Sequence, residues 1–335
     1  MASAYSSQPG YAVIPGFTDP NDPKKTPQIL VFYNTANSNL AVELWKGDKS
    51  DARNVEDSLS ALSTDRVGFV SNPTHLAAAA LSGTNVVVGF TESESSGGSY
   101  SSISDPTESA PATMASTSTH KVSILSPIYQ TLDDTDAGNV TIAIASSNPI
   151  AASSATEDDA WVYYLKTDTD NDNKLSVFEY SLSNREAAAL GANPISGSSL
   201  SAYWDGSTRW VIYQGKADKK NNYQLFEHDP GNDLDAKIPG TGAATKCCKV
   251  AIAHDATTSK TYLYFTTDSG DIYRVIKDGK WNGSAAQISD SAKTQVAAVS
   301  QLAAIYSGGV VHLFFTNRDG RNPNKAHVVD DVSKA

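Results

Sequence analysis

The chain has 335 residues, of which 40% are hydrophobic and 19% are charged. This length and composition predict a soluble globular protein with a large core. The formal net charge of −11 argues against nucleic acid or an anionic membrane as a partner, because both would repel the average surface.

The chain starts with "MASAYSSQPGYAVIPGF", which has no basic segment followed by an apolar stretch of about 7 to 15 residues. No run of 18 apolar residues occurs anywhere. A cytoplasmic protein that does not span a membrane is therefore expected, and a leader missing from the sequence as given would reverse the location. Cys247 and Cys248 are adjacent, so they are poor candidates for a structural disulfide and lack metal-type spacing.

Short β-rich runs separated by Gly, Asn, Asp and Ser follow one another along the whole chain. Helical periodicity is almost absent, and the Ala-rich "NREAAALGAN" at 184–193 is the nearest helical candidate. The fold class is predicted to be all-β.

One small-residue motif returns along the chain, as "HLAAAALSG", "PIAASSATE", "SLSAYWDG", "KVAIAHDA" and "QLAAIYSG". The last four copies begin at residues 149, 199, 249 and 301, about 50 residues apart. Each is followed by an aromatic strand, a polar turn and another strand, and a period of about 40–50 residues with four strands is typical of a β-propeller blade. The alanines fit innermost strands, which converge on the axis of the ring.

Counting "GYAVIPG" as the first innermost strand predicts six four-stranded antiparallel blades in a single domain, residues 1–335. A seventh blade stays open between residues 75 and 149. That region contains a Ser/Thr-rich stretch at 93–119, which has too few apolar residues for a core and is predicted to be a long loop.

The stretch "DTDNDNKLSVFE" at 168–179 has the spacing of a calcium loop, with Asp168, Asp170 and Asp172 at positions 1, 3 and 5 and Glu179 at position 12. Asn173 replaces the glycine expected at position 6, and the flanks are strands. An acidic turn between the second and third strands of a blade is favoured over a calcium site, and no metal is expected.

The "LAA" strands, combined with blades of the form V-Y-Y-Q, turn, I-x-E, G-x-W, resemble the fungal fucose-specific lectins of the Aleuria type. The resemblance covers most of the chain and implies six blades with sugar sites between them. The resemblance implies that each sugar site has three parts, which are an Arg just before the V-Y-Y strand, a Glu on the next strand and an aromatic side chain. Arg and Glu form hydrogen bonds with the sugar hydroxyls, while the aromatic ring stacks on the apolar face of the sugar.

This set of sugar-binding residues is incomplete here, because no aligned blade has the arginine. In its place stand Leu30, Trp161, Trp210, Tyr262 and His312. The glutamate aligns with Glu43, Glu179 and Glu227, but Arg274 replaces it in "DIYRV". The sugar sites are interpreted as degenerate, with Arg274 and Trp281 as remnants of one of them.

Residues at the ends of the innermost strands are expected to line a central channel, and they differ from blade to blade. One asymmetric pocket suggests one asymmetric ligand, a small hydrophobic or aromatic molecule. His75, Tyr203 and Lys249 are the catalytic candidates, since an imidazole, phenol and ammonium can move protons or hold charge. The substrate-binding candidates are Tyr11, Trp204, His254, Gln301, Tyr306, Arg274 and Trp281. The competing structural interpretations are that His75 caps a turn, that Lys249 is solvated, and that the aromatic residues pack the channel.

The main hypothesis is an enzyme without a cofactor, because lectin-like propellers of this kind are similar to the hetero-Diels–Alderases of fungal tropolone sesquiterpenoid biosynthesis. That similarity implies dehydration of a tropolone to a quinone methide and its cycloaddition to a terpene, helped by proximity and by His75 or Tyr203. The alternative is a carbohydrate-binding lectin with diverged sites, and the second alternative is a polysaccharide lyase. Homodimerisation stays open.

Overall fold

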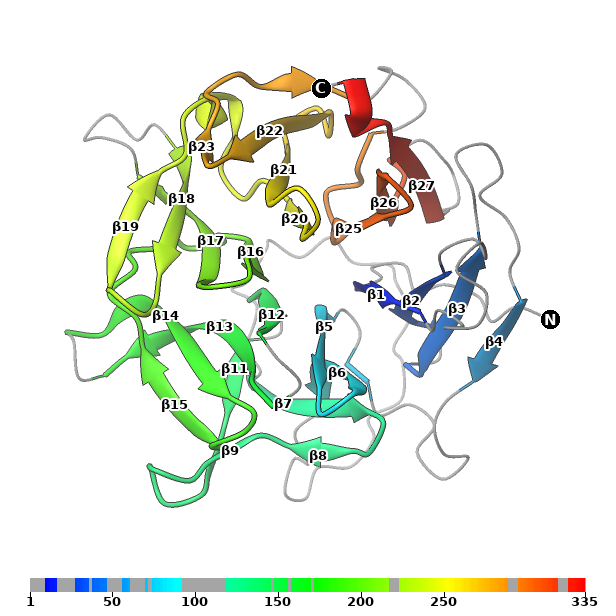
Figure 1. Ribbon diagram of the computed structural model, residues 1–335. Helices are drawn as coiled ribbons and strands as arrows, with labels where there is room; N and C mark the ends of the chain where they lie inside the picture. The colour runs from blue at the N-terminus through cyan, green and yellow to red at the C-terminus, as the bar shows by residue number, and fades with distance from the viewer. Residues whose placement is uncertain are drawn as a thin grey trace, which may run out of the picture.

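The strands of the chain form a ring of six antiparallel sheets, which confirms the predicted six-bladed β-propeller (Figure 1). The computed structural model describes residues 10–16, 28–35, 38–46, 56–60, 70–71, 74–91, 119–145, 148–155, 158–169, 172–216, 223–288, 295–318 and 325–334. No α-helix occurs in these ranges, and the helical segments are the 3-10 turns η1 (Thr241–Ala243) and η2 (Val332–Lys334).

The blades follow one another along the chain, and each is numbered from its innermost strand outward. Blade 1 contains β1 (Tyr11–Pro15), β2 (Gln28–Asn34), β3 (Leu40–Lys46) and β4 (Glu56–Ser60). Blade 2 contains β5 (Leu76–Leu81), β6 (Thr84–Thr91), β7 (Thr119–Ser126), β8 (Gln130–Thr131) and β11 (Ala143–Ala145), beside a small ribbon of β9 (Asp133–Asp134) and β10 (Val140–Thr141).

The later blades carry the repeat that the sequence shows most clearly. Blade 3 contains β12 (Ile150–Ser154), β13 (Ala160–Asp168), β14 (Lys174–Ser181) and β15 (Glu186–Ala189). Blade 4 contains β16 (Leu200–Trp204), β17 (Arg209–Lys216), β18 (Tyr223–Asp229) and β19 (Leu234–Lys237). Blade 5 contains β20 (Val250–Asp255), β21 (Lys260–Thr266), β22 (Ile272–Asp278), β23 (Lys280–Trp281) and β24 (Ala286–Gln287), and blade 6 contains β25 (Ala303–Ser307), β26 (Val310–Thr316) and β27 (Lys325–Asp330).

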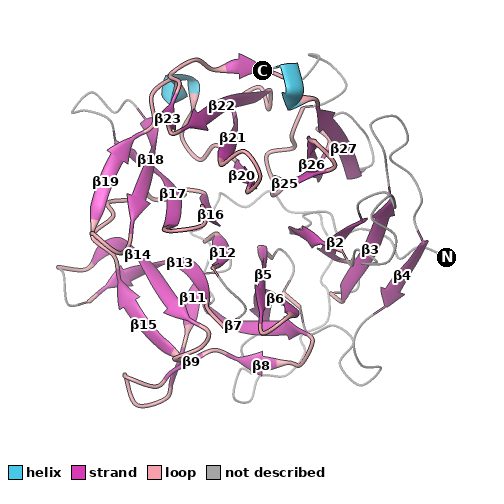
Figure 2. Cartoon of the chain, in the orientation of Figure 1, coloured by secondary structure: helices cyan, strands magenta, loops and turns pink. Residues whose placement is uncertain are grey.

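The innermost strands are the small-residue motifs, and they surround the axis in the centre of the ring (Figure 2). Alanine is frequent at positions that line the channel, including Ala77, Ala151 and Ala251. Six strands can approach the axis only where their inward side chains are short. The alanine repeat is therefore a consequence of crowding at the centre of the ring.

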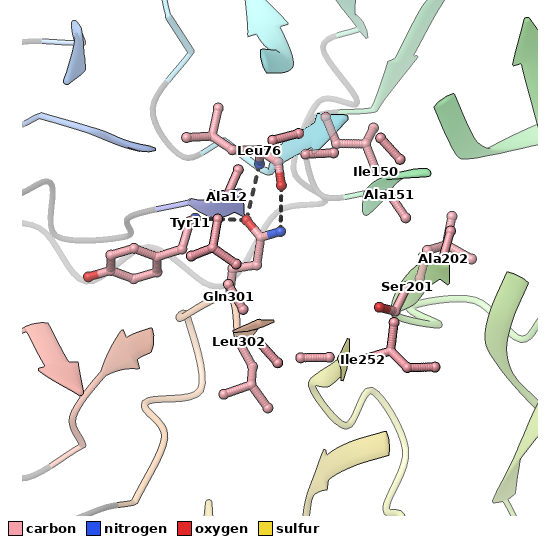
Figure 3. A pocket seen from close by; sticks show the side chains of 18 of the residues that line it. Tyr11, Ala12, Leu76, Ile150, Ala151, Ser201, Ala202, Ile252, Gln301 and Leu302 are labelled. Atoms are coloured by element: carbon pink, nitrogen blue, oxygen red, sulfur yellow. Dashed lines mark hydrogen bonds between the residues drawn. The ribbon is translucent and has the colours of Figure 1, made fainter. Parts of the chain in front are cut away.

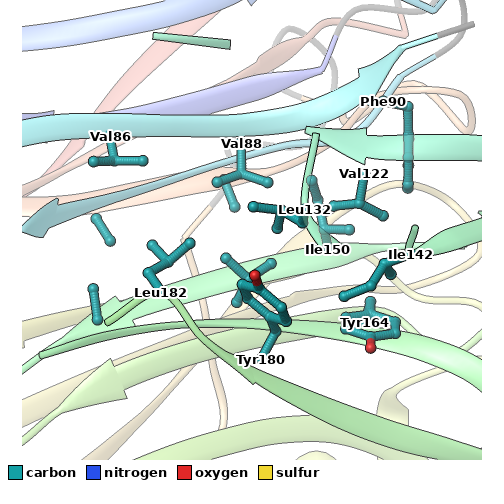
Figure 4. Close-up of a cluster of buried hydrophobic side chains, with 14 of the residues drawn as sticks. Val86, Val88, Phe90, Val122, Leu132, Ile142, Ile150, Tyr164, Tyr180 and Leu182 are labelled. Carbon is teal, nitrogen blue, oxygen red and sulfur yellow. The ribbon is translucent and has the colours of Figure 1, made fainter. Parts of the chain in front are cut away.

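The cores lie between the blades, because each sheet buries both of its faces against its neighbours. The largest described cluster joins blade 2 to blade 3, where Val88 and Val122 pack against Tyr164 and Tyr180 (Figure 4). All four side chains are at most 1% exposed. Burial of each such side chain stabilises the fold by about 1.5–3 kcal/mol.

The Ala-rich segment that was the nearest helical candidate contains the strand β15 instead, since pairing of Ala187, Ala188 and Ala189 with β14 at the sheet edge overrides the high intrinsic helix propensity of alanine. The predicted loop at 93–119 lies outside the described residues, except that Thr119 begins β7.

Gln301 connects the last blade to the first two at the narrow end of the channel (Figure 3). Its side-chain oxygen accepts hydrogen bonds from the backbone N–H groups of Tyr11 at 2.9 Å and Leu76 at 3.0 Å, and its amide nitrogen donates to the Leu76 carbonyl at 2.7 Å. The Tyr11 hydroxyl also lies 3.0 Å from the Thr316 hydroxyl of blade 6. These contacts help to close the ring where the two ends of the chain meet.

Replacement of Gln301 by leucine is expected to lower the free energy of unfolding by about 1–3 kcal/mol, because backbone groups at the start of β1 and β5 lose their partner. Urea unfolding followed by tryptophan fluorescence measures this. Gln287→Ala, at an exposed position on β24, is the control and should change stability by less than about 0.5 kcal/mol. Equal effects of the two variants would contradict the role of Gln301 in closing the ring.

Candidate functional site

Successive side chains along a strand point to opposite faces of a blade, so alternate residues enter the spaces before and after it. We call these spaces gap 3/4, gap 4/5, gap 5/6 and gap 6/1 after the blades that enclose them. Three of the gaps contain an ion pair across the two blades, in which Glu179, Glu227 and Arg274 occupy equivalent positions on the third strands of blades 3, 4 and 5.

Gap 3/4 contains Glu179, Arg209 and two tryptophans. Arg209, at the start of β17, donates a hydrogen bond from Nε to a Glu179 carboxylate oxygen on β14 at 2.8 Å. Its guanidinium lies 4.9 Å from the ring centre of Trp161, and Trp161 faces Trp204 with 6.5 Å between ring centres and 24° between planes. In the part of the chain that the structure describes, no hydrogen bond uses the two Nη groups of Arg209.

Gap 4/5 also pairs a third-strand glutamate with a cation of the next blade, but here the cation is a lysine that fills the gap. Glu227 takes the strand position of Glu179, since Glu179 pairs with Tyr163 and Glu227 with the equivalent Ile212. Lys277 of β22 donates to both Glu227 oxygens at 2.9 and 3.0 Å. Burial, followed by the negative charge of Glu227, raises the pKa of Tyr203, whose hydroxyl donates to Glu227 at 2.6 Å.

Gap 5/6 has the opposite arrangement of charges. Arg274 occupies the strand position that Glu227 has in blade 4. Asp330 occupies the position that Lys277 has in blade 5, because Asp330 pairs with Val311, Lys277 pairs with Thr261, and these two partners are equivalent. The Arg274 guanidinium donates to Asp330 at 2.6 Å, and the Tyr264 hydroxyl donates to the same oxygen at 2.9 Å. Tyr262 and Tyr306 stack on each other in this gap, as Trp161 and Trp204 do in gap 3/4.

Glu43 does not belong to this series, which corrects the sequence alignment. Glu43 pairs with Val31, whereas Glu179 pairs with Tyr163, one position further along the second strand. Glu43 therefore points toward gap 6/1, where it accepts a hydrogen bond from the Trp45 indole at 3.1 Å. A one-residue difference in register moves a side chain to the other face of the sheet.

Solvent access distinguishes the three ion pairs. The Arg209 and Glu179 side chains are 29% and 12% exposed. The four charged side chains of gaps 4/5 and 5/6 are between 5% and 14% exposed. Arg209 is therefore the most exposed of these six charged side chains, whereas Glu179 is about as enclosed as the charged residues of the other two gaps.

Comparison with solved structures finds the same fold in several lectins. The fucose-recognising lectin of Aleuria aurantia, described as a six-bladed β-propeller, shares 15% identity over 98% of this chain and 97% of the other, with a TM-score of 0.64. The chain has the same six-bladed β-propeller fold as this lectin. AofleA from Arthrobotrys oligospora shares 14% identity over 96% of this chain and 82% of the other, with a TM-score of 0.58. The SapL1 lectin, solved with α-methyl fucoside, shares 13% identity over 97% and 96%, with a TM-score of 0.56.

These likenesses concern the fold of the lectin-like propeller. No protein-family model matches the sequence, and no curated protein matches it. At 13–16% identity the residues of the sites must be judged from this chain alone.

The central channel of the lectin-like propeller does not bring the three catalytic candidates together. His75 and Lys249 immediately precede β5 and β20, at the narrow end, where the cavity has a volume of about 160 Å³. Tyr203 lies near the wider end, a hollow of about 350 Å³, with its hydroxyl turned into gap 4/5. The catalytic roles of these residues stay predictions, but Tyr203 lies near the opposite end of the channel from the other two.

Burial, and after it the charge of Lys249, lowers the pKa of His75 to about 4. Burial also lowers the pKa of Lys249. The charge of Lys249 therefore reaches His75 at the narrow end of the channel.

The other candidates divide between ring closure and the gaps. Tyr11 and Gln301 hold strands together at the narrow end. Trp204, His254 and Tyr306 take equivalent positions at the ends of β16, β20 and β25, line the wide end, and enter gaps 3/4, 4/5 and 5/6. Arg274 and Trp281 lie in different gaps, 5/6 and 4/5, so they do not form the single inter-blade site that the sequence interpretation gave them, because their side chains leave opposite faces of blade 5.

Three charged residues that form ion pairs across the gaps were not found from the sequence. They are Arg209, Lys277 and Asp330. Arg209 stands one residue before Trp210, beside the position where arginine was sought, and it serves the gap on the other side of its blade. The alternation of faces was the available signal, since residues 209 and 210 must enter different gaps.

The acidic stretch at 168–179 lies on the hairpin of β13 and β14, as predicted. Glu179 is five residues beyond Lys174, the start of β14, or about 16 Å along an extended strand, and its carboxylate binds Arg209. Asp170 is outside the described residues. Within the described ranges, no three His, Cys, Asp or Glu side chains gather as a metal site would need.

Cys247 and Cys248 are both free thiols. The described helical segments are too short or too polar to cross a bilayer.

Glu227→Gln is expected to destabilise the protein by about 3–5 kcal/mol, because the enclosed Lys277 ammonium loses its counter-charge. Urea unfolding provides the measurement. The double variant Glu227→Leu with Lys277→Met should lose less, since no uncompensated charge remains. Lys174→Ala is the matched control, because its pair with Asp172 is exposed at 61% and 90% and should contribute little. A Glu227→Gln effect as small as that of the control would contradict this account of gap 4/5.

The free energy of unfolding should decrease as the pH is lowered, in part because His75 becomes protonated. The unfolded chain protonates this imidazole below about pH 6.5 while the folded protein resists until about pH 4, so its contribution is lost as the pH falls between these values. Between pH 7 and 4.5 the wild type should lose about 2–3 kcal/mol more than His75→Asn. Paired urea titrations at the two pH values measure the difference, and parallel pH profiles would contradict a neutral imidazole at His75 in the folded protein.

Proposed function

We propose that this protein binds carbohydrate, and that its site is gap 3/4. The observation that supports this most directly is the combination of the Arg209 and Glu179 ion pair with Trp161 and Trp204. It supplies hydrogen-bond donors, carboxylate acceptors and aromatic faces in one partly open space.

These groups suit a sugar ring. The unused Nη groups of Arg209 can donate to two hydroxyls, and the Glu179 carboxylate can accept from a third. The C–H face of a pyranose can stack on an indole ring. Trp204 supplies such a ring at the wide end of the channel. The arginine comes from blade 4 and the glutamate from blade 3, so the site differs from the pattern sought within one blade.

Fucose is the first ligand to test, because lectins with this fold recognise fucose or were solved with α-methyl fucoside. One occupied gap implies one sugar per chain, whereas avidity needs several sites that act together. The cyclase and lyase hypotheses stay predictions without a described cluster of groups to support them, since Tyr203 is distant from His75 and Lys249.

Isothermal titration with α-methyl fucoside, followed by a glycan array, should find one site per chain. Glu179→Gln and Arg209→Ala should each weaken binding by about 10–100-fold, because each removes a charge-assisted hydrogen bond. Trp204→Ala should weaken it comparably through loss of the stacking surface. Tyr306→Ala removes the equivalent aromatic residue of gap 5/6 and should leave binding unchanged. Binding that survives Arg209→Ala, or absence of binding to every glycan tested, would refute the proposal.

A further inference from the structure

The Lys277 ammonium of gap 4/5 is held as a bound ligand would be. It donates to both oxygens of Glu227 at 2.9 and 3.0 Å and to the Tyr203 hydroxyl at 3.0 Å. It lies 4.1 Å from the ring centre of Trp210 and 5.7 Å from those of Tyr203 and Trp281. A carboxylate with three aromatic rings is the chemistry that selects a cation.

The enclosing residues of this cage, Tyr203, Trp210, Glu227 and Trp281, hold one another in place. The Trp281 indole donates to one Glu227 oxygen at 3.1 Å, and the Tyr203 hydroxyl donates to the other at 2.6 Å. The Trp210 indole is anchored separately by a hydrogen bond of 2.7 Å to Asp205. The cage therefore has its own hydrogen-bond framework, to which the lysine adds the central cation.

Neighbouring gaps indicate that the fold does not require a lysine here. Lys277 lies three residues after Arg274, and the residue three positions after Glu227 in blade 4 is Pro230. Gap 3/4 consequently has no cation from that position and uses Arg209 of the second strand, while gap 5/6 has Asp330 there. Blades pack against each other with each of these choices, so the cage and its occupant are a local feature of gap 4/5.

We propose that gap 4/5 is a binding site for an ammonium-bearing ligand, such as an alkylamine or an amino sugar, and that Lys277 closes it in the free protein. A tethered side chain acts as a competitor at an effective concentration in the millimolar range or higher. An external amine must displace Lys277, so the unmodified protein binds it weakly. This site and its ligand are independent of sugar binding in gap 3/4.

The test is Lys277→Ala, which removes the three methylenes and the ammonium beyond Cβ, the atoms of n-propylammonium. Addition of n-propylammonium chloride should raise the melting temperature of the variant and change its tryptophan fluorescence, both with saturation. The affinity should exceed that of the wild type at least tenfold. n-Propanol has the same shape without the charge and should have no effect, and sodium chloride at equal ionic strength controls for salt.

The double variant Lys277→Ala with Glu227→Gln should lose the response, because the carboxylate is removed while the rings remain. Glucosamine compared with N-acetylglucosamine then tests whether the site admits an amino sugar, since acetylation removes the charge. If Lys277→Ala does not fold alone, its refolding yield in n-propylammonium chloride against sodium chloride provides the same comparison. Absence of a saturable effect in the folded variant, an equal effect of propanol, or no recovery on refolding would overturn the proposal.

Discussion

The alternation of side chains along the strands of tightly packed blades governs this structure. Both faces of every blade are covered, so each residue of a second or third strand enters the gap on one side or the other. Apolar residues satisfy this arrangement without cost. A charged residue at the same position is removed from water and needs an opposite charge from the facing blade.

The three ion-paired gaps are different solutions to that requirement. In gap 3/4 the partner of Glu179 comes from a second strand, and in gap 4/5 the partner of Glu227 comes from a third strand. In gap 5/6 both signs are exchanged, with Arg274 facing Asp330. The scaffold tolerates all three because it constrains the net charge of the pair and the space it occupies, but not which blade supplies which sign.

This view connects the lectin-like fold to its proposed ligands. An ion pair that fills its gap supports packing, and the same pair with more solvent access can receive hydroxyl groups. Arg209, at 29%, is more exposed than any charged side chain of the two following gaps. In gap 4/5 the aromatic residues enclose a lysine, so the carboxylate and the rings are already occupied.

The central channel is shaped by a different constraint. Its alanines allow six inner strands to converge, and Gln301 hydrogen-bonds the backbone of two of them. Because the innermost strands run side by side, residues that begin them and residues that end them lie near opposite ends of the channel. His75 and Lys249 are consequently separated from Tyr203, although all three belong to innermost-strand motifs.

The sequence alone determined the all-β class, the six blades, the innermost strands and the hairpin at 168–179, because these depend on local patterns that repeat. It also indicated Glu179, Glu227, Arg274 and Trp281 as residues of the gaps. Only the tertiary structure decided how charges pair, because the partners are 30 to 56 residues apart and belong to different blades. It also decided the face of Glu43, since a register difference of one residue reverses the direction of a side chain and leaves no trace in a blade alignment.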